Sequence, residues 1–197
     1  SKAAGGKPIV NSVAETRWDM LDVSKLQPAK VVLMASERLE GGVPVPNQTA
    51  AEIAETARRM TQRILRNGVR LAPEDLLVDV SLCPLASDTE GIVRRAIEAI
   101  RLIGQMPEMR GVHLLVGLSN LGIMLPKQAL DGSKLSVKVE SAFLTMTMPH
   151  GLDFILGTAG REYQLLPEDD FVYRGVRAVV AAEGYDALDK VRELYQS

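Results

Sequence analysis

The sequence is poor in the residues that form disulfides and metal sites. It has one cysteine, Cys83, and two histidines among its 197 residues. A single thiol cannot form an internal disulfide, which indicates a reducing compartment, and we expect the cytoplasm. With so few nitrogen and sulfur ligands we expect no zinc or iron site, and we interpret His113 and His150 as packing or capping residues. We interpret Cys83 as a small buried hydrophobic residue.

The chain also lacks a basic excess and a long apolar run. Its formal net charge is −2 at pH 7, so no surplus of cations is present to neutralise a nucleic-acid backbone. No apolar run approaches the roughly 18–20 residues of a membrane-spanning helix, and Ser1–Lys7 is not followed by the apolar segment of a signal peptide. We therefore expect neither nucleic acid nor a membrane as a partner. Hydrophobic residues make up 46% of the chain, which is typical of a globular domain with a substantial core.

Short apolar runs alternate with helical stretches along the chain. This alternation predicts βα units and a parallel sheet. The predicted strands are Pro8–Asn11, Ala29–Ala35, Leu76–Val80, Val112–Leu118 and, more weakly, Phe154–Gly157. The predicted helices, with apolar residues three and four apart, are Thr49–Gly68, Asp88–Met106, Ser136–Pro149, Phe171–Ala182 and Tyr185–Tyr195. Thr49 and Asp88 are predicted to be helix N-caps, and Gly68 is predicted to be a C-cap.

Two long segments between the predicted strands and helices are predicted to be loops. They are Glu37–Gln48, which is rich in Gly and Pro, and Leu125–Leu135. Both follow the C-terminal end of a predicted strand. In a parallel barrel that end is the active face, so these loops are either functional or tolerated insertions.

Polar residues stand at the ends of three predicted strands. Asn11 ends the first strand, Asp79 lies in the third and Asn120 follows the fourth. Polar groups at such positions cost desolvation unless they are satisfied. A carboxylate can accept two parallel N–H bonds from an amino-pyrimidinone edge, and an amide can both donate and accept. The three side chains could therefore bind a flat heterocycle, or they could be strand-end caps and turn formers.

Four segments carry a resemblance to a known family. They are GKPIVNSV at Gly6–Val13, LLVDVSLCPL at Leu76–Leu85, LLVGLSNLGIMLP at Leu114–Pro126 and SAFLTMTMPHGLDFIL at Ser141–Leu156. In this order they resemble the pterin-binding enzyme family. The match is best with its methyltetrahydrofolate branch, which comprises the folate domain of cobalamin-dependent methionine synthase and the methyltransferases that serve corrinoid proteins. The resemblance covers Gly6 to about Gly157.

The resemblance implies an α/β fold, the (β/α)8 TIM barrel of the pterin-binding type, in one domain over residues 1–197. Such a barrel typically takes about 250 residues, so we expect this chain to hold only the C-terminal five or so βα units. We expect about three further units on the N-terminal side. An open parallel sheet covered on both faces is the alternative.

The resemblance also implies a function and a site. Asp79 would accept hydrogen bonds from the amino-pyrimidinone edge of the pterin, and Asn11 would bond another edge. Asn120 would act catalytically by hydrogen-bonding N5, the nitrogen that carries the methyl group, while Gly117 and Ser119 would shape the floor. The substrate would be tetrahydrofolate or methyltetrahydrofolate, and the methyl group would move to or from the cobalt of a cobalamin carried by a partner corrinoid protein. Homodimerisation through barrel helices is compatible with the family.

The chain departs from the family pattern at two places. Val80–Cys83 separate Asp79 from Pro84, where the family often places Pro-Leu directly after the aspartate. After Asn120 the family often has a polar residue, whereas Gly122–Met124 is apolar. The first departure leaves open whether Cys83 lines the site.

Other interpretations remain. Dihydropteroate synthase shares the barrel but carries S-R-K where this chain has Ser119-Asn120-Leu121, which argues against that reaction. A non-catalytic folate-binding module would bind folate without transfer, and a (β/α) protein with another ligand would bind no pterin. A charged C-terminal stretch is predicted to be either an exposed face or a docking surface for the corrinoid protein; it comprises Arg161, Glu168, Asp169, Asp170 and Arg174.

Overall fold

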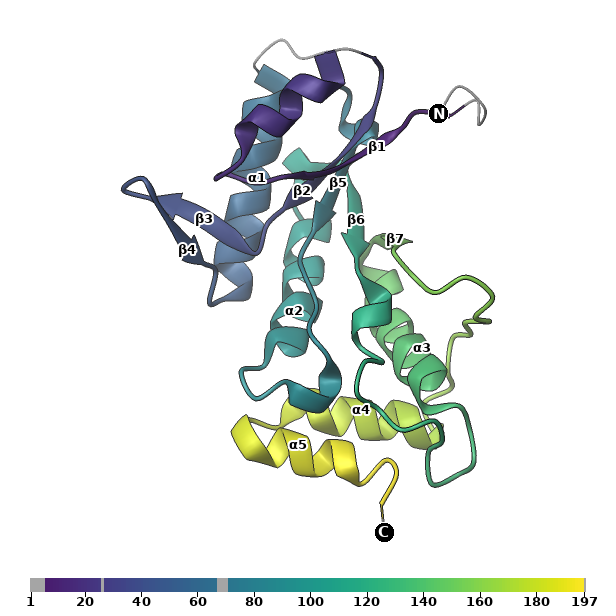
Figure 1. Cartoon of the computed structure of the whole chain (residues 1–197). Coiled ribbons are helices and arrows are strands. Elements are labelled where there is room, and N and C mark those ends of the chain that lie inside the picture. The colour runs from purple at the N-terminus through teal and green to yellow at the C-terminus, as the bar shows by residue number, and fades with distance from the viewer. Residues whose placement is uncertain (1–5, 26, 67–70, 197) are drawn as a thin grey trace. The chain divides into compact units, whose positions relative to one another are not determined.

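The computed structural model describes residues 6–25, 27–66 and 71–196, and Figure 1 shows its elements. The chain forms two compact units. The first comprises residues 1–81 and 99–115, and the second comprises residues 82–98 and 116–197. One boundary follows Ser81, and the other two fall within helix α2 (Ile92–Gly104) and strand β6 (His113–Val116). The single-domain interpretation of residues 1–197 stays a prediction.

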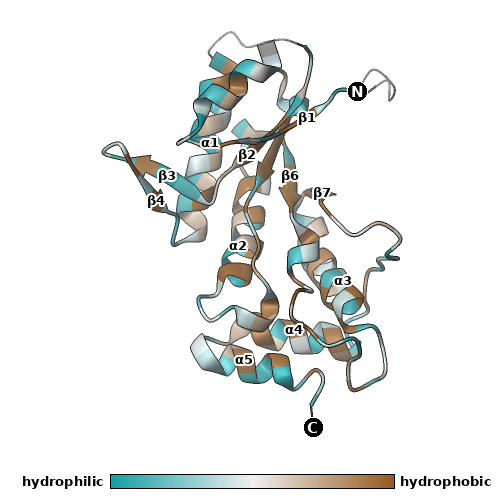
Figure 2. Ribbon diagram, in the orientation of Figure 1, coloured by the Kyte–Doolittle hydropathy of each residue, from teal (hydrophilic) through white to brown (hydrophobic). Residues whose placement is uncertain are grey.

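The first unit contains a parallel sheet, as the alternating pattern predicts. Strand β2 (Lys30–Met34) pairs in parallel with β1 (Ile9–Val13) on one side and with β5 (Leu76–Asp79) on the other, and β5 pairs in parallel with β6. Three successive residues of β2, Val31–Leu33, are at most 1% exposed, so both faces of this strand are covered. Figure 2 shows the apolar character of β2, β5 and β6. The α/β class with parallel strands is therefore confirmed.

Helix α1 (Ala50–Arg66) begins at a reciprocal cap in the first unit. Thr49 Oγ1 accepts a hydrogen bond from the Glu52 backbone N–H at 3.2 Å, and the Glu52 carboxylate accepts one from the Thr49 N–H at 2.9 Å. The predicted N-cap at Thr49 is confirmed, because two otherwise unsatisfied donors are paired here. The predicted C-cap at Gly68 lies outside the described residues. Short 3₁₀ helices precede β2, β5 and β6; they are η1 (Trp18–Lys25), η2 (Pro73–Asp75) and η4 (Pro107–Met109).

The predicted loop Glu37–Gln48 is wrong from Glu37 to Pro46, because the chain forms a β-hairpin there. Strand β3 (Glu37–Glu40) pairs antiparallel with β4 (Val43–Pro46). Gly41 and Gly42 connect the two strands with φ of 59° and 85°, and positive φ at both central residues is what a tight two-residue hairpin turn requires. The prolines of β4 are tolerated because each strand of a two-stranded hairpin has a free edge.

The second unit contains the remaining helices. Helix α3 (Leu135–Thr147) packs against α4 (Phe171–Ala181), and α4 packs against α5 (Gly184–Arg192). Strand β7 (Leu152–Ile155) lies beside the end of β6, where the Leu156 N–H donates to the Val116 carbonyl at 2.9 Å. Three short 3₁₀ helices complete the unit: η3 (Leu85–Ser87), η5 (Leu118–Asn120) and η6 (Met148–His150).

Asp88 is not the N-cap residue that was predicted, because α2 begins only at Ile92, but its side chain caps the start of the helix from four residues upstream. The Asp88 carboxylate accepts hydrogen bonds from the backbone N–H groups of Ile92 and Val93, both at 2.8 Å. Across the described residues, no helix is long and apolar enough to cross a membrane.

Asn47 joins three elements of the first unit, which gives a test of the fold. The side chain is 3% exposed, and its Nδ2 donates to the Ala35 carbonyl at 2.8 Å and to Thr56 Oγ1 at 3.0 Å. We expect Asn47→Ala to cost about 1–3 kcal/mol of unfolding free energy, because it leaves a buried carbonyl unpaired. The melting temperature, followed by circular dichroism, should fall by about 2–4 °C for each kcal/mol lost. The exposed neighbour Gln48, changed to Ala, is the control; equal melting temperatures for the two variants would contradict this role.

Candidate functional site

Asn11 lies near the C-terminal end of β1. Its Cα partner is Val32 in β2, and the side chain is exposed, whereas those of its neighbours Val10 and Ser12 are buried. The register shifts after Asn11, because Val13 pairs with Leu33 and leaves Ser12 between the two pairs. The amide of Asn11 is therefore open to a ligand from the strand end.

Asp79 ends β5 and is partly buried. Its Oδ1 accepts a hydrogen bond from the Ser81 N–H at 2.8 Å, with Ser81 in the left-handed region at φ 62°. Burial raises the pKa of the Asp79 carboxyl above its usual value, and the Ser81 hydrogen bond opposes that rise. The described part of the chain offers this carboxylate no cation and no second hydrogen-bond donor. A ligand with N–H donors would therefore stabilise the charged form.

The register of the first unit relates Asn11 to Asp79. Asn11 pairs with Val32 and Asp79 pairs with Met34, so the two lie on opposite sides of β2 and two positions apart along it. Two strand spacings and two residues of rise separate their backbones by roughly 10 Å across and about 7 Å along the strands. That spacing is too wide for a direct hydrogen bond between short side chains. A flat bicyclic ring could contact both.

Gly117, Ser119 and Asn120 belong to the second unit, in the turn that follows β6. The Ser119 N–H donates to the Leu156 carbonyl at 3.3 Å, which fixes this turn beside the end of β7. The Asn120 N–H donates to the Gly117 carbonyl at 3.0 Å and closes the turn. A Cβ at position 117 would lie 3.0 Å from Asn120 Nδ2, so the glycine leaves room for the amide of Asn120.

The Asn120 amide has one half committed to the protein. Nδ2 donates to the Leu82 carbonyl over 3.4 Å, a long hydrogen bond. None of the described residues donates a hydrogen bond to Oδ1. Asn120 is neither exposed nor fully buried. The side chain is therefore held in place by the backbone and still presents a hydrogen-bond acceptor.

The five predicted site residues thus fall into two groups. Asn11 and Asp79 lie at the strand ends of the first unit, and Gly117, Ser119 and Asn120 form one turn of the second. Within each unit the structure places them at the C-terminal end of a parallel strand, the position that the sequence pattern predicts. The ligand-binding roles of these residues stay predictions.

Cys83 is partly buried, and its environment keeps it protonated. Burial, followed by the nearby Asp88 carboxylate, raises the pKa of the Cys83 thiol to about 12. A thiol of that pKa is almost entirely uncharged at neutral pH, and therefore a poor nucleophile and metal ligand. The residues that the structure describes include no group of three or more His, Cys, Asp or Glu side chains arranged to hold a metal ion.

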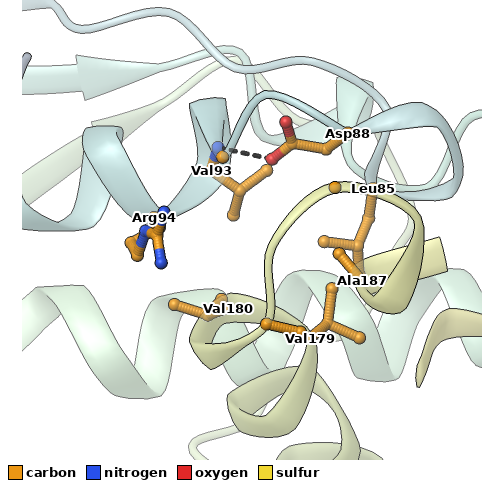
Figure 3. Close-up of a pocket in the computed structure, with 10 residues that line it drawn as sticks. Leu85, Asp88, Val93, Arg94, Val179, Val180 and Ala187 are labelled. Atoms are coloured by element: carbon orange, nitrogen blue, oxygen red, sulfur yellow. Dashed lines mark hydrogen bonds between the residues drawn. The ribbon is translucent and has the colours of Figure 1, made fainter. Parts of the chain in front are cut away.

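Two cavities of the second unit lie away from the predicted residues. One, of about 10 Å³, lies between the α2 N-terminus and the α4–α5 connection (Figure 3); its lining includes Leu85, Arg94 and Val179. It has room for about one water molecule and cannot hold a pterin. The other, of about 220 Å³, lies between α3 and the segment after β7, and its lining includes Lys134, Lys138 and Glu162.

The charged stretch after β7 is less exposed than predicted. Arg161 forms an ion pair with Glu140 of α3, and its side chain is 27% exposed. Asp170 pairs with Lys138 and caps α4 by accepting from the Tyr173 N–H at 3.0 Å. The prediction of a solvated face is therefore wrong for these two residues. Arg161 pairs with a buried carboxylate, and Asp170 caps a helix. Glu168, Asp169 and Arg174 are exposed as predicted.

The sequence interpretation missed two polar residues near the predicted ones. Ser81, whose N–H bonds Asp79, gave no signal because its role depends on a left-handed backbone conformation. Glu140 is fully buried in α3. Its signal in the sequence was an acidic residue within a predicted helix, between Val139 and the run Ser141–Leu144.

Comparison with known proteins identifies the family of the chain. The model of the family described as "Pterin binding enzyme" matches residues 2–156, a span that includes β1 to β7 and all five predicted site residues. No curated protein matches the chain. The matched span is well over half of the sequence, and the chain therefore belongs to the pterin-binding enzyme family.

Proposed function

We propose that this protein is a methyltransferase that moves a methyl group between methyltetrahydrofolate and the cobalt of a corrinoid protein. The observation that carries the proposal is the G-L-S-N turn after β6. There Gly117 makes room for the Asn120 amide, and Oδ1 is left available as an acceptor. Family membership supports pterin binding in general. The methyl transfer, the corrinoid partner and the cytoplasmic location are parts of the proposal.

The pterin would lie at the ends of β1 and β5. Asp79 offers a partly desolvated carboxylate, which can accept two parallel N–H bonds from an amino-pyrimidinone edge. Asn11 offers an exposed amide, which can donate to or accept from another edge of the ring. The spacing of these two residues across β2 suits a ligand of bicyclic size better than it suits a direct contact.

Asn120 would stabilise the leaving group. When the methyl carbon leaves N5, the bonding electron pair remains on that nitrogen, which must gain a proton from the surrounding water. An asparagine has no useful pKa and cannot supply that proton itself. Its Oδ1 can accept a hydrogen bond from protonated N5, and this bond strengthens as the transition state is reached. The cobalt of the partner's corrinoid would accept or donate the methyl group, and the direction follows from the methyl source.

We further propose that the parallel strands form the C-terminal part of a (β/α)8 barrel. The support is the parallel pairing of β1, β2, β5 and β6, with polar residues at their C-terminal ends. In such barrels the active site lies at that face. The sequence Ser119-Asn120-Leu121 lacks the basic pair of dihydropteroate synthase, so methyl transfer is favoured over pteroate synthesis.

Asp79 should contribute strongly to folate affinity. We expect Asp79→Ala to weaken methyltetrahydrofolate binding by about 10- to 100-fold in isothermal titration calorimetry, because hydrogen bonds to a charged group are worth about 1.5–3 kcal/mol. Glu168→Ala removes an exposed carboxylate and is the matched control; its affinity should equal that of the parent chain. A parent chain that binds no reduced folate would overturn the pterin assignment.

Asn120 should matter for transfer more than for binding. With cob(I)alamin as the methyl acceptor, we expect Asn120→Ala to slow transfer by about 10²- to 10³-fold, as removal of a transition-state hydrogen bond does. The folate dissociation constant should change much less. The assay follows the loss of cob(I)alamin absorbance, with Gln105→Ala, an exposed amide, as the control. Folate binding by the parent chain without any transfer would instead indicate a non-catalytic folate-binding module.

The raised pKa of Asp79 predicts the pH dependence of binding. Burial favours the protonated carboxyl in the free protein, whereas the pterin edge needs the carboxylate. Affinity should therefore be low below that pKa, rise as the pH rises through it and become constant above it. Calorimetry from about pH 4 to pH 8 on the parent and on Asp79→Asn tests this, since the difference between them cancels the ionisation of the ligand itself. The expectation fails if the variant keeps the slope of the parent.

A further inference from the structure

Glu140 is a charged residue in an unusual place. It lies in the middle of α3, and its side chain is 0% exposed. Asp88, which is also buried, caps the start of α2. Glu140 has no such role because it lies within a helix rather than at its start. A buried carboxylate is costly to desolvate, so its partners should indicate what it does.

The carboxylate of Glu140 contacts the two segments that follow β6 and β7. Arg161, in the segment after β7, forms an ion pair with it. Gly122, two residues after Asn120, approaches so closely that a Cβ there would lie 2.8 Å from Glu140 Oε1 and 2.8 Å from Ser136 Cβ. Glu140 therefore lies where the turn that carries Asn120 packs on α3.

The second carboxylate oxygen of Glu140, Oε2, lies near a further side chain. Oε2 is buried and has no hydrogen-bond partner among the described residues. A donor is close by, the hydroxyl of Tyr163. Burial and then the Glu140 carboxylate raise the pKa of this hydroxyl. The Tyr163 oxygen also accepts a hydrogen bond from the Thr158 N–H at 3.3 Å. The Arg161–Tyr163 segment thus brings a guanidinium and a phenol to one carboxylate.

We propose that Glu140 is a positioning residue for Asn120. With Arg161, it holds the Leu118–Leu125 turn against α3, so that the Asn120 amide keeps its place above Gly117. Backbone hydrogen bonds link the turn to its neighbours, since the Ile123 N–H donates to the Asn120 carbonyl at 3.2 Å and the Leu85 N–H donates to the Leu121 carbonyl at 3.3 Å. The inference rests on the proposed role of Asn120 in methyl transfer.

A double-mutant cycle between positions 140 and 120 tests the inference. Glu140→Gln removes the charge and keeps the shape, and transfer to cob(I)alamin is measured with and without Asn120→Ala. We expect Glu140→Gln to slow transfer by about tenfold in the parent and by less than about twofold in the Asn120→Ala background. A residue that acts through the Asn120 amide has nothing left to position once that amide is gone. A merely structural role would slow transfer equally in both backgrounds, and that result would overturn the inference.

Gly122→Ala repeats the test without changing any charge. It places a methyl group against Glu140 Oε1 and Ser136, so it should displace the same turn and show the same dependence on Asn120. If Glu140→Gln does not fold, this variant decides the question by the same criterion. Glu162→Gln, an exposed carboxylate beside Arg161, is the control and should transfer at the parent rate. If the parent is active and both Glu140→Gln and Gly122→Ala transfer at the parent rate, this inference alone is overturned. If the parent neither binds folate nor transfers the methyl group, the proposed function is overturned as well.

Discussion

The burial of β2 on both faces is the constraint on which the rest of the first unit depends. Val31, Val32 and Leu33 are at most 1% exposed, and each fully buried side chain of this size contributes about 1.5–3 kcal/mol. Because β2 lies between β1 and β5, its burial fixes the register of both neighbours. That register puts Asn11 and Asp79 at the same end of the sheet. These two polar side chains are therefore placed by apolar packing in which they take no part.

Partial burial then determines how the polar groups of the candidate site can bind a ligand. Asp79 is buried enough for the pKa of its carboxyl to rise, yet its one partner among the described residues is a backbone N–H. Asn120 is held by a long hydrogen bond from Nδ2 to a backbone carbonyl, and Gly117 has no side chain that would displace its amide. Both residues are thus only partly satisfied by the protein. Partly satisfied groups at strand ends are what a ligand rich in donors and acceptors would complete.

Much of this arrangement could be predicted from the sequence, and the misses have physical causes. Continuous apolar runs predicted β2 and β5, and the three- and four-residue spacing predicted α1 and α4. The β3–β4 hairpin was missed because the prolines of β4 obscured its strand pattern, although Gly41-Gly42 was a signal for the turn. The role of Arg161 could not be read from its neighbours, since its partner Glu140 lies 21 residues away in the chain. Local patterns specify elements, whereas ion pairs between distant segments depend on the assembled fold.

The crystal structure of this protein with methyltetrahydrofolate would test the central claim most directly. The account predicts the amino-pyrimidinone edge within hydrogen-bond distance of the Asp79 carboxylate, Asn11 beside another edge of the ring, and N5 next to Asn120 Oδ1. A folate bound elsewhere, for example in the cavity between α3 and the segment after β7, would contradict it. The strand-end residues would then have structural roles, and the family fold would serve a different site.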